Sequence, residues 1–379
     1  MRHNLTMFDR NPAELKLARG KLKFPVFMPD ATFGYVRAVE SSDLEAANIQ
    51  AVCMNAFHIM QKPGSTSVQS LGGLHRMSGW NKPIITDSGG FQAYSLIRQN
   101  AKFGEMSARG ISFFPEGAGR KFNLTPEKSI QNQMAFGADV VICLDDCTHV
   151  EASAQEQELS VTRTIEWANR CRRTYDKLVK EKKLTEDDKP LIFGVVQGGG
   201  IKELRKYCAD ELLKIGFDGY GFGGFPLDDQ GNLLTDILEY TRGLIPRQFP
   251  MHALGVGHPY NLAQCYRLGY GIFDSAMPTR DARRGRIYRL ETTNAKWLDS
   301  DHQDWLKYIY IQDMEYKKNP GPVSAHCDCL TCTRYSLGYL HHLFKMNDAL
   351  YSRLATIHNL RFMTLLTEQL QRHANAVQC

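Results

Sequence analysis

The sequence predicts an α/β protein built on a parallel sheet, and three observations support this fold class. Eight short apolar runs recur without polar alternation, as expected for strands buried on both faces. Helical patterns lie between several of these runs, and polar residues or glycines follow each run. Eight such units match a TIM barrel, although the same alternation permits an open doubly wound sheet. The runs are Phe24–Met28, Ala51–Met54, Pro83–Thr86, Val140–Leu144, Leu191–Val196, Gly219–Phe222, Met251–Val256 and Gly271–Ala276.

Amphipathic patterns predict helices between these strands. Within Ser160–Leu178, apolar residues such as Val161 and Ile165 recur with three- to four-residue spacing. This is the period of a helix that buries one face. The segments Glu203–Ile215 and Asn261–Leu268 have similar patterns, so helices are expected there too.

The most specific local motif is a group of three cysteines and one histidine. Cys327, Cys329 and Cys332 have the spacing C-x-C-x-x-C, and His358 follows twenty-six residues after the last of them. Three thiolates and one imidazole form the closed tetrahedral ligand set of a structural zinc site. His326 is a rival fourth ligand, but its adjacency to Cys327 makes that geometry awkward. The sequence therefore predicts a structural Zn²⁺ ion bound by the three cysteines and His358.

Two longer segments interrupt the alternation of strands and helices. Residues 93–125, after the third run, are expected to form a hairpin or an irregular excursion. Residues 286–337, after the eighth run, contain the cysteines, and residues 338–374 predict two helices with His358 on the second. We expect a barrel over residues 1–285 and a zinc-binding subdomain with closing helices over residues 286–379.

Composition indicates an ordinary soluble globular protein, with 43% hydrophobic and 23% charged residues. The formal charge of +5 is compatible with a nucleic-acid partner but does not indicate one. The seven cysteines outside the motif are scattered, which is typical of reduced cytosolic thiols. Residues 1–5 lack an apolar region, and no apolar run approaches a membrane span. We expect a cytoplasmic protein with no membrane partner.

Polar residues or glycines stand at the end of every apolar run. In a barrel, these positions converge on the mouth where TIM-barrel enzymes place their catalytic groups. The coincidence at eight strand ends is more informative than any single residue. The residues are Asp30, Asn55, Asp87, Asp145, Asp146, Gln197, Gly223, Gly224, Gly255, Gly257 and Asp274.

The sharpest motif at a strand end is Asp87–Gln92, which reads Asp-Ser-Gly-Gly-Phe-Gln. It combines an acid with two glycines that let a ligand approach the backbone closely. Phe91 is suited to stacking, and the amide of Gln92 is suited to reading a polar edge. The alternative is a structural turn capped by Asp87.

Two further acidic positions could carry chemistry. Asp145 and Asp146 could bind a metal, transfer protons or bind a base edge, although one of them could simply cap a helix. Asp274 follows two apolar residues, so partial desolvation would suit a nucleophile or base. Its alternative is a salt bridge to Arg280 or Arg283.

Guanidinium groups match phosphates and base edges, although charge runs usually form solvated faces. The arginines that follow Asp274 are Arg280, Arg283, Arg284, Arg286 and Arg289.

Taken in order, these motifs resemble the tRNA-guanine transglycosylases, also called queuine tRNA-ribosyltransferases. The resemblance runs from about Pro25 to His358. It implies a TIM barrel with an inserted zinc subdomain and a homodimeric pentosyltransferase that needs neither ATP nor a catalytic metal. The implied reaction replaces guanine in nucleic acid, most simply at the wobble position of a tRNA anticodon, with a 7-deazaguanine base. The motifs are Asp87–Gln92, Asp145–Thr148, Val196–Gly199, Gly223–Gly224, Phe273–Arg280 and Cys327 to His358.

The resemblance also implies individual roles. Asp274 would attack C1′ of a flipped-out nucleotide and form a covalent glycosyl intermediate. Asp87 would be the general acid and base, and Phe91 and Leu254 would sandwich the purine ring. The other implied base-binding residues are Ser88, Gln92, Asp145, Cys147, Gln197, Gly223, Gly224 and Gly255. The implied nucleic-acid-binding residues are Arg280, Arg283, Arg284 and Arg286.

Several segments depart from the family pattern. The segment Gly224–Asp228 reads Gly-Phe-Pro-Leu-Asp where the bacterial enzymes carry a smaller Leu-Ala-Val sequence, which leaves the incoming base open. One alternative is therefore the same exchange on DNA guanine. Another is a non-catalytic subunit of a heterodimer, which the retention of Asp87 and Asp274 disfavours. A third is a metal-dependent hydrolase that uses His58 and the two consecutive aspartates.

Overall fold

Eight parallel strands form a barrel in the computed structural model, which describes residues 11–99, 104–114, 121–149, 152–291 and 305–378. Their order around the barrel is β3-β13-β12-β11-β10-β9-β5-β4. The ring closes between β3 and β4, where Asp30 forms a parallel bridge with Cys53. The strands are β3 (Val26–Pro29), β4 (Val52–Asn55), β5 (Ile84–Asp87), β9 (Val140–Ile142), β10 (Leu191–Val196), β11 (Gly219–Phe222), β12 (Met251–Ala253) and β13 (Ile272–Ser275).

The barrel prediction is confirmed, and each of the eight apolar runs contains one of its strands. The runs Leu191–Val196 and Gly219–Phe222 match β10 and β11 at both ends, and the other runs differ from their strands by one to three residues. The open doubly wound sheet is therefore wrong.

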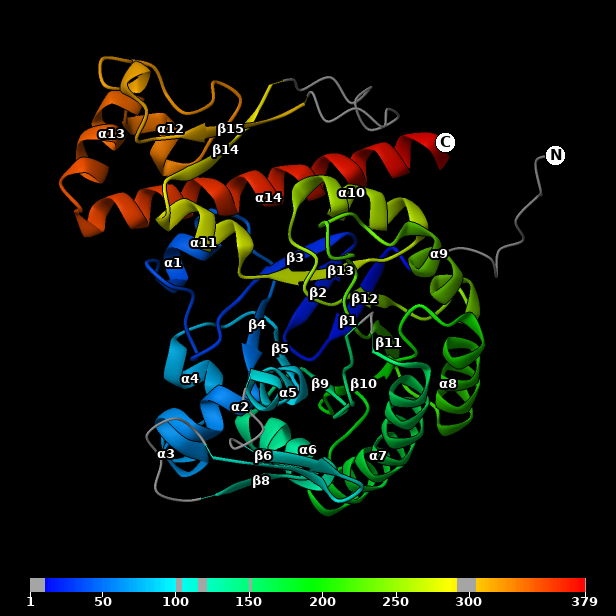
Figure 1. The fold of residues 1–379 in the computed structure, drawn as a ribbon. Coiled ribbons are helices and arrows are strands. Elements are labelled where there is room, and N and C mark those ends of the chain that lie inside the picture. Colours follow the sequence, from blue (N-terminus) through cyan, green and yellow to red (C-terminus); the bar gives the residue numbers. More distant parts are fainter. Residues whose placement is uncertain (1–10, 100–103, 115–120, 150–151, 292–304, 379) are drawn as a thin grey trace.

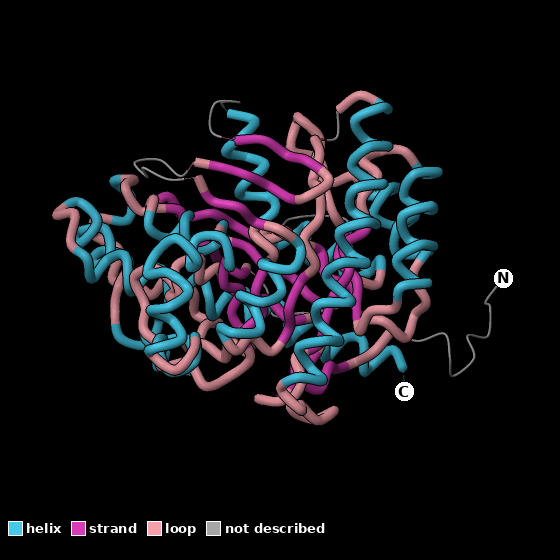
Figure 2. Tube along the Cα trace, turned by 90° about the horizontal axis from the view of Figure 1, so that it is seen from below, coloured by secondary structure: helices cyan, strands magenta, loops and turns pink. Residues whose placement is uncertain are grey.

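Helices surround the strands on the outside. Figure 1 shows this in a view along the barrel axis, and Figure 2 shows it in a perpendicular view. Helix α7 begins at Ala154, after a capping box between Ser153 and Glu156, six residues before the helix expected from sequence periodicity. The helices of this part are α1 (Ser41–Ala46), α2 (Ala56–Ile59), α3 (Ser65–Ser70), α4 (Leu74–Ser78), α5 (Gly90–Gln99), α6 (Pro126–Phe136), α7 (Ala154–Glu181), α8 (Lys202–Ile215), α9 (Thr235–Leu244), α10 (Pro259–Leu268) and α11 (Met277–Arg283).

Two hydrophobic clusters hold the barrel together, because its strands are buried on both faces. The larger cluster packs the strands against the surrounding helices. The smaller one fills the barrel interior with residues such as Val26, Met28 and Val195. The hairpin of β1 (Glu14–Leu17) and β2 (Gly20–Lys23) adds apolar side chains to this interior cluster.

The insertion after β5 forms a helix and a small antiparallel sheet. Helix α5 comes first, followed by β6 (Gly104–Ser107), β7 (Gly110–Phe113) and β8 (Phe122–Leu124). The first two strands form the expected hairpin, and β8 adds a third strand to it. Parts of the predicted insertion, residues 100–103 and 115–120, lie outside the described residues.

The chain ends in a small subdomain and one long helix. An antiparallel pair, β14 (Arg286–Leu290) and β15 (Leu306–Tyr310), packs with helices α12 (Leu330–Arg334) and α13 (Leu337–Lys345). Helix α14 (Ala349–Gln378) contacts this subdomain and also α11, β3 and α1 of the barrel (Figure 1). The two predicted closing helices thus correspond to α13 and α14.

No helix among the described residues is long and apolar enough to cross a membrane. The six cysteines between Cys53 and Cys265 are free and buried, which agrees with reduced thiols. The predicted absence of a signal peptide concerns residues 1–5, and these, like Cys379, lie outside the described residues.

Candidate active site and metal centre

A cavity of about 500 Å³ lies at the carboxyl ends of the barrel strands. Four aspartates line it, and no lysine, arginine or histidine lines it within the described parts of the chain. Such a cavity favours a neutral or cationic ligand over an anion. The sequence-predicted residues that line it are Asp87, Ser88, Phe91, Gln92, Asp145, Cys147, Gly223, Gly224, Leu254, Gly255 and Asp274. Gln197 does not line the cavity but bonds to Asp145 behind its wall.

Asp274 stands at the end of β13 with one oxygen anchored. Its Oδ1 accepts a hydrogen bond from His252 Nε2 at 2.8 Å and another from the Gly255 amide at 3.0 Å. These contacts replace the salt bridge to Arg280 or Arg283 that the sequence left open. Within the described residues, Oδ2 accepts no hydrogen bond, so this oxygen is available to a ligand.

Asp87 ends β5 and faces the same cavity. Its Oδ2 accepts hydrogen bonds from Asn55 Nδ2 at 2.7 Å and Gln92 Nε2 at 3.4 Å. Burial, together with the smaller effect of the nearby charges of Asp274 and Asp30, raises the pKa of Asp87 to about 8. Its Oδ1 is buried and has no partner among the described residues. The carboxyl group is therefore protonated near neutral pH, with Oδ1 free to hold the proton.

Asp145 is the centre of a polar wall of the cavity. Its Oδ2 accepts a hydrogen bond from Gln197 Nε2 at 2.6 Å, and Ser88 Oγ donates to its Oδ1 at 3.4 Å. Burial raises the pKa of Asp145 to about 6, while the bond from Gln197 opposes this shift. Gln197 Oε1 is buried and has no partner in the described part of the chain. Asp145, which lines the cavity, thus offers acceptor oxygens to a ligand with N–H donors.

The second aspartate of the pair is structural. Asp146 Oδ2 forms an ion pair with Arg163 of α7, and its backbone amide bonds to Thr164 Oγ1 at 3.0 Å. The sequence left one of the two aspartates to a structural role, and the geometry gives that role to Asp146. The structure therefore separates it from Asp145, which lines the cavity.

Aromatic and apolar side chains form the other walls. Phe91 is 45% exposed, and its ring lies 5.6 Å from that of Phe225. Phe225 also packs against His149 at 4.9 Å. Leu254 lines the cavity, and burial raises the pKa of the Cys147 thiol, which keeps it neutral. Phe225 belongs to the segment that departs from the family pattern, so this departure shapes the cavity itself.

The four predicted nucleic-acid-binding arginines lie on and after α11, which follows Asp274 directly. Arg280 and Arg284 are exposed, and Arg283 is half-buried with its Nη1 unpartnered among the described residues. Arg286 differs, because its guanidinium pairs with Asp281 at 2.5 Å and stacks over Tyr308. Arg280 and Arg284 are therefore exposed on the helix that follows the cavity-lining residue Ala276, while Arg286 is held within the subdomain.

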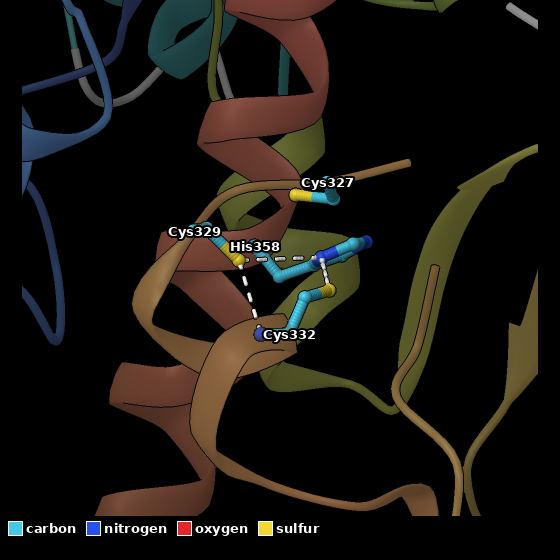
Figure 3. A group of neighbouring side chains, drawn as sticks. All are labelled: Cys327, Cys329, Cys332 and His358. Atoms are coloured by element: carbon cyan, nitrogen blue, oxygen red, sulfur yellow. Dashed lines mark hydrogen bonds between the residues drawn. The ribbon is translucent and has the colours of Figure 1, made fainter. Parts of the chain in front are cut away.

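A candidate metal centre joins the subdomain to α14, as Figure 3 shows. One ligand atom from each of Cys327, Cys329, Cys332 and His358 lies within 4.8 Å of the others. His358 Nδ1 is 3.1 Å from Cys332 Sγ, and its Nε2 donates to the Tyr288 carbonyl at 2.6 Å. Such a second hydrogen bond orients a metal-binding histidine. Thiolate and imidazole donors in this number fit a tetrahedral metal ion.

This is the single metal-binding group that the described residues form. His326 is not part of it, in agreement with the choice of His358 from the sequence. His58 and the consecutive aspartates do not form such a group within the described ranges, so the hydrolase alternative has no metal site there.

The comparisons with known proteins agree with this arrangement. The family model for queuine tRNA-ribosyltransferase matches residues 11–376, which include all eight barrel strands and the metal centre. The chain belongs to the queuine tRNA-ribosyltransferase family. The chain is therefore an enzyme of the pentosyltransferase class, as the resemblance implied.

Curated members of the family are similar over most of their length. A queuine tRNA-ribosyltransferase of Idiomarina loihiensis is 37% identical over 91% of this chain and 84% of its own. The protein of the same name from Mannheimia succiniciproducens is 36% identical over 92% and 84%. The one from Acinetobacter baumannii strain AYE is 35% identical over 93% and 87%.

Sequence reasoning missed two residues that position the family's site. His252 bonds Asp274, and the available signal was a histidine within an apolar strand, two residues before Leu254. Arg205 is buried and donates to the carbonyls of Gly199 and Gly223 at 2.7 and 3.1 Å. An arginine on a helix face gives no sequence signal of this kind, because its partners come from other loops.

Proposed function

We propose that this enzyme replaces guanine in tRNA with a 7-deazaguanine base through a covalent intermediate on Asp274. The observation that carries the proposal is the pair of aspartates in one cavity, each with one oxygen anchored and the other unbonded within the described residues. The relatives are named for action on tRNA, which supports tRNA as the substrate. The anchored carboxylates support nucleophilic and acid–base roles.

The first half of the reaction would use both aspartates. The free Oδ2 of Asp274 would attack C1′ of the target nucleotide, and the bond from C1′ to N9 of guanine would break. Its electron pair would leave with the guanine, which would take the proton held by Asp87. The incoming base would then reverse these steps, with its N9 attacking C1′ and Asp87 taking its proton. Each displacement enters opposite its leaving group and inverts C1′, so the two inversions together retain the configuration.

Asp145 and Ser88 would recognise the guanine-like edge, and Gln197 would hold Asp145 in place from behind the wall. Guanine and 7-deazaguanines present adjacent N–H donors, which the oxygens of Asp145 would accept. The base must leave its stack to reach the cavity. Phe91 and Leu254 are placed to contact its faces.

The exposed Arg280 and Arg284 would contact the nucleic acid around the flipped nucleotide, since arginines beside an acidic cavity attract phosphates. The metal centre would hold Zn²⁺ in a structural role, with all four ligands supplied by the protein. The homodimer and the cytoplasmic location stay predictions from the resemblance and the composition.

A trapping experiment tests the reaction. The enzyme is mixed with tRNA, or with duplex DNA in a parallel sample, and quenched in denaturant. We expect a protein–RNA adduct that survives denaturation. It should disappear when a 7-deazaguanine is added before the quench. An adduct with DNA alone would move the activity to DNA, and no adduct with either would contradict the proposal.

Replacing Gly223 with alanine should weaken base binding. A Cβ at this position would lie 2.5 Å from Gln197 Nε2, so Gln197 would lose its position against Asp145. We expect the KM for the incoming base to rise about tenfold, the cost of about one hydrogen bond to a charged group. Gly200→Ala is the matched control, because its Cβ meets nothing within 4 Å. Equal KM values for the two variants would contradict this role of Gln197.

The protonated Asp87 makes stability depend on pH. Its pKa is about 8 in the folded protein against an ordinary value of 3.8, so the folded state binds the proton more tightly than the unfolded state. Its stabilising effect is complete below about pH 4 and is lost as the pH rises through about 8. Asp87→Asn cannot ionise, so it should gain stability relative to the native enzyme across this window.

Thermal unfolding at about pH 5, 7 and 9 measures this effect. The midpoint of Asp87→Asn should exceed that of the native enzyme by an increasing margin, while base exchange is lost. Asp228→Asn, at an exposed turn, is the control and should show no such trend. A constant margin for Asp87→Asn would show that the carboxyl group is ionised throughout.

A further inference from the structure

We propose that two hydrogen-bond donors, His252 Nε2 and the Gly255 amide, hold Asp274 Oδ1 and so direct Oδ2 to C1′. This donor pair also speeds the discharge of the covalent intermediate. The inference rests on the proposed function and deepens it. The two donors lie 2.8 and 3.0 Å from the same oxygen. They come from β12 and the turn after it, whereas Asp274 is the next-to-last residue of the neighbouring strand β13.

The surroundings of His252 fix it as a donor toward Asp274. Its side chain is fully buried, and its Nδ1 has no hydrogen-bond partner among the described residues. A proton on Nδ1 would be a buried donor without an acceptor, which is costly. A proton on Nε2 instead meets a carboxylate oxygen. The imidazole therefore carries its hydrogen on Nε2 and donates it to Oδ1.

The second donor depends on the conformation of Gly255. Its φ of +76° lies in the left-handed region, which glycine adopts without steric cost. This turn leaves the backbone amide directed at Oδ1. With both donors on one oxygen, the carboxylate of Asp274 has a fixed orientation, and the oxygen free to react is Oδ2.

The donor pair acts differently on the two halves of the reaction. After Oδ2 bonds to C1′, Asp274 is an ester and Oδ1 is its carbonyl oxygen. When N9 of the incoming base attacks C1′, the bond from C1′ to Oδ2 breaks and its electron pair returns to the carboxylate. Hydrogen bonds to a charged acceptor are stronger than those to a neutral one. The pair therefore stabilises the carboxylate over the ester and favours its departure.

Two substitutions separate this role from a purely structural one. His252→Leu fills the buried space without a donor, and His252→Gln keeps an N–H group near the position of Nε2. The enzyme is first charged with tRNA, then mixed with guanine and quenched at intervals. The discharge rate of His252→Leu should fall about tenfold or more, the scale of one hydrogen bond to a charged group. Its adduct should accumulate, and His252→Gln should recover most of the native rate.

The rates of adduct formation and discharge distinguish a positioning role of His252 from a structural one. Native discharge by His252→Leu, or equally slow discharge by both variants, would overturn it. Equal slowing of adduct formation and discharge would indicate a structural role instead. Should His252→Leu fail to fold, His252→Asn, whose shorter amide does not reach Oδ1, replaces it. A native enzyme that forms no adduct would overturn the proposed function and this inference with it.

Discussion

Replacing Asp274 with asparagine is expected to abolish base exchange, lowering kcat by roughly 10⁴-fold or more, as removal of a catalytic nucleophile does. An amide cannot supply the carboxylate electron pair that attacks C1′. The substitution preserves the size of the side chain, and its Oδ1 can still accept from His252 and Gly255. Binding of tRNA should therefore persist while the covalent adduct disappears.

Asp30→Asn is the matched control for this prediction. It makes the same change of charge at a third aspartate of the same cavity, held by Thr32 at the end of β3. Denaturing electrophoresis after a quench measures the adduct for each variant. Asp30→Asn should still form it. Adduct formation by Asp274→Asn at the native rate would remove Asp274 from the role of nucleophile.

Replacing Cys329 with serine should have the largest effect on stability. It removes one of four ligands from a centre that ties the subdomain to His358 in α14. Metal binding in such a site is folding energy, so we expect a loss of more than about 3 kcal/mol in the free energy of unfolding. Because α14 also packs on α11 and β3, the damage should reach the barrel and the arginines beside its mouth.

Zinc content by elemental analysis and thermal unfolding measure this effect together. Cys265→Ser is the matched control, because Cys265 is fully buried but lies outside the metal centre. It should keep about one zinc ion per chain and lose far less stability. A Cys329→Ser protein with native zinc content and a native unfolding midpoint would show that the centre does not hold a structural zinc ion.

Much of the fold could be predicted because its signals are local. A strand buried on both faces needs a continuous apolar run, and the first and last residues of β10 and β11 are the same as those of the apolar runs that predict them. The three-stranded sheet at 104–124 is only partly predictable, because β8 is three residues long and gives too short a pattern to indicate a strand. Helix α7 was placed too late, although Ser153 and Glu156 carried the signal of its start.

The candidate site divides in the same way. The sequence can predict that Asp87, Asp145 and Asp274 lie together, because strand ends meet at the barrel mouth regardless of how the side chains pack. The bond from His252 to Asp274 depends on two neighbouring strands and the orientation of an imidazole, which sequence spacing does not encode. The same holds for Arg286, which the arginine run grouped with its neighbours and the structure pairs with Asp281.

The incorporation of labelled guanine tests the central claim most directly. The enzyme is incubated with radiolabelled guanine and either tRNA bearing a GUN anticodon or double-stranded DNA, without ATP. We expect label in tRNA alone, and none with Asp274→Asn. Label in DNA alone would assign the exchange to DNA, and label in neither would contradict a catalytic role for this cavity.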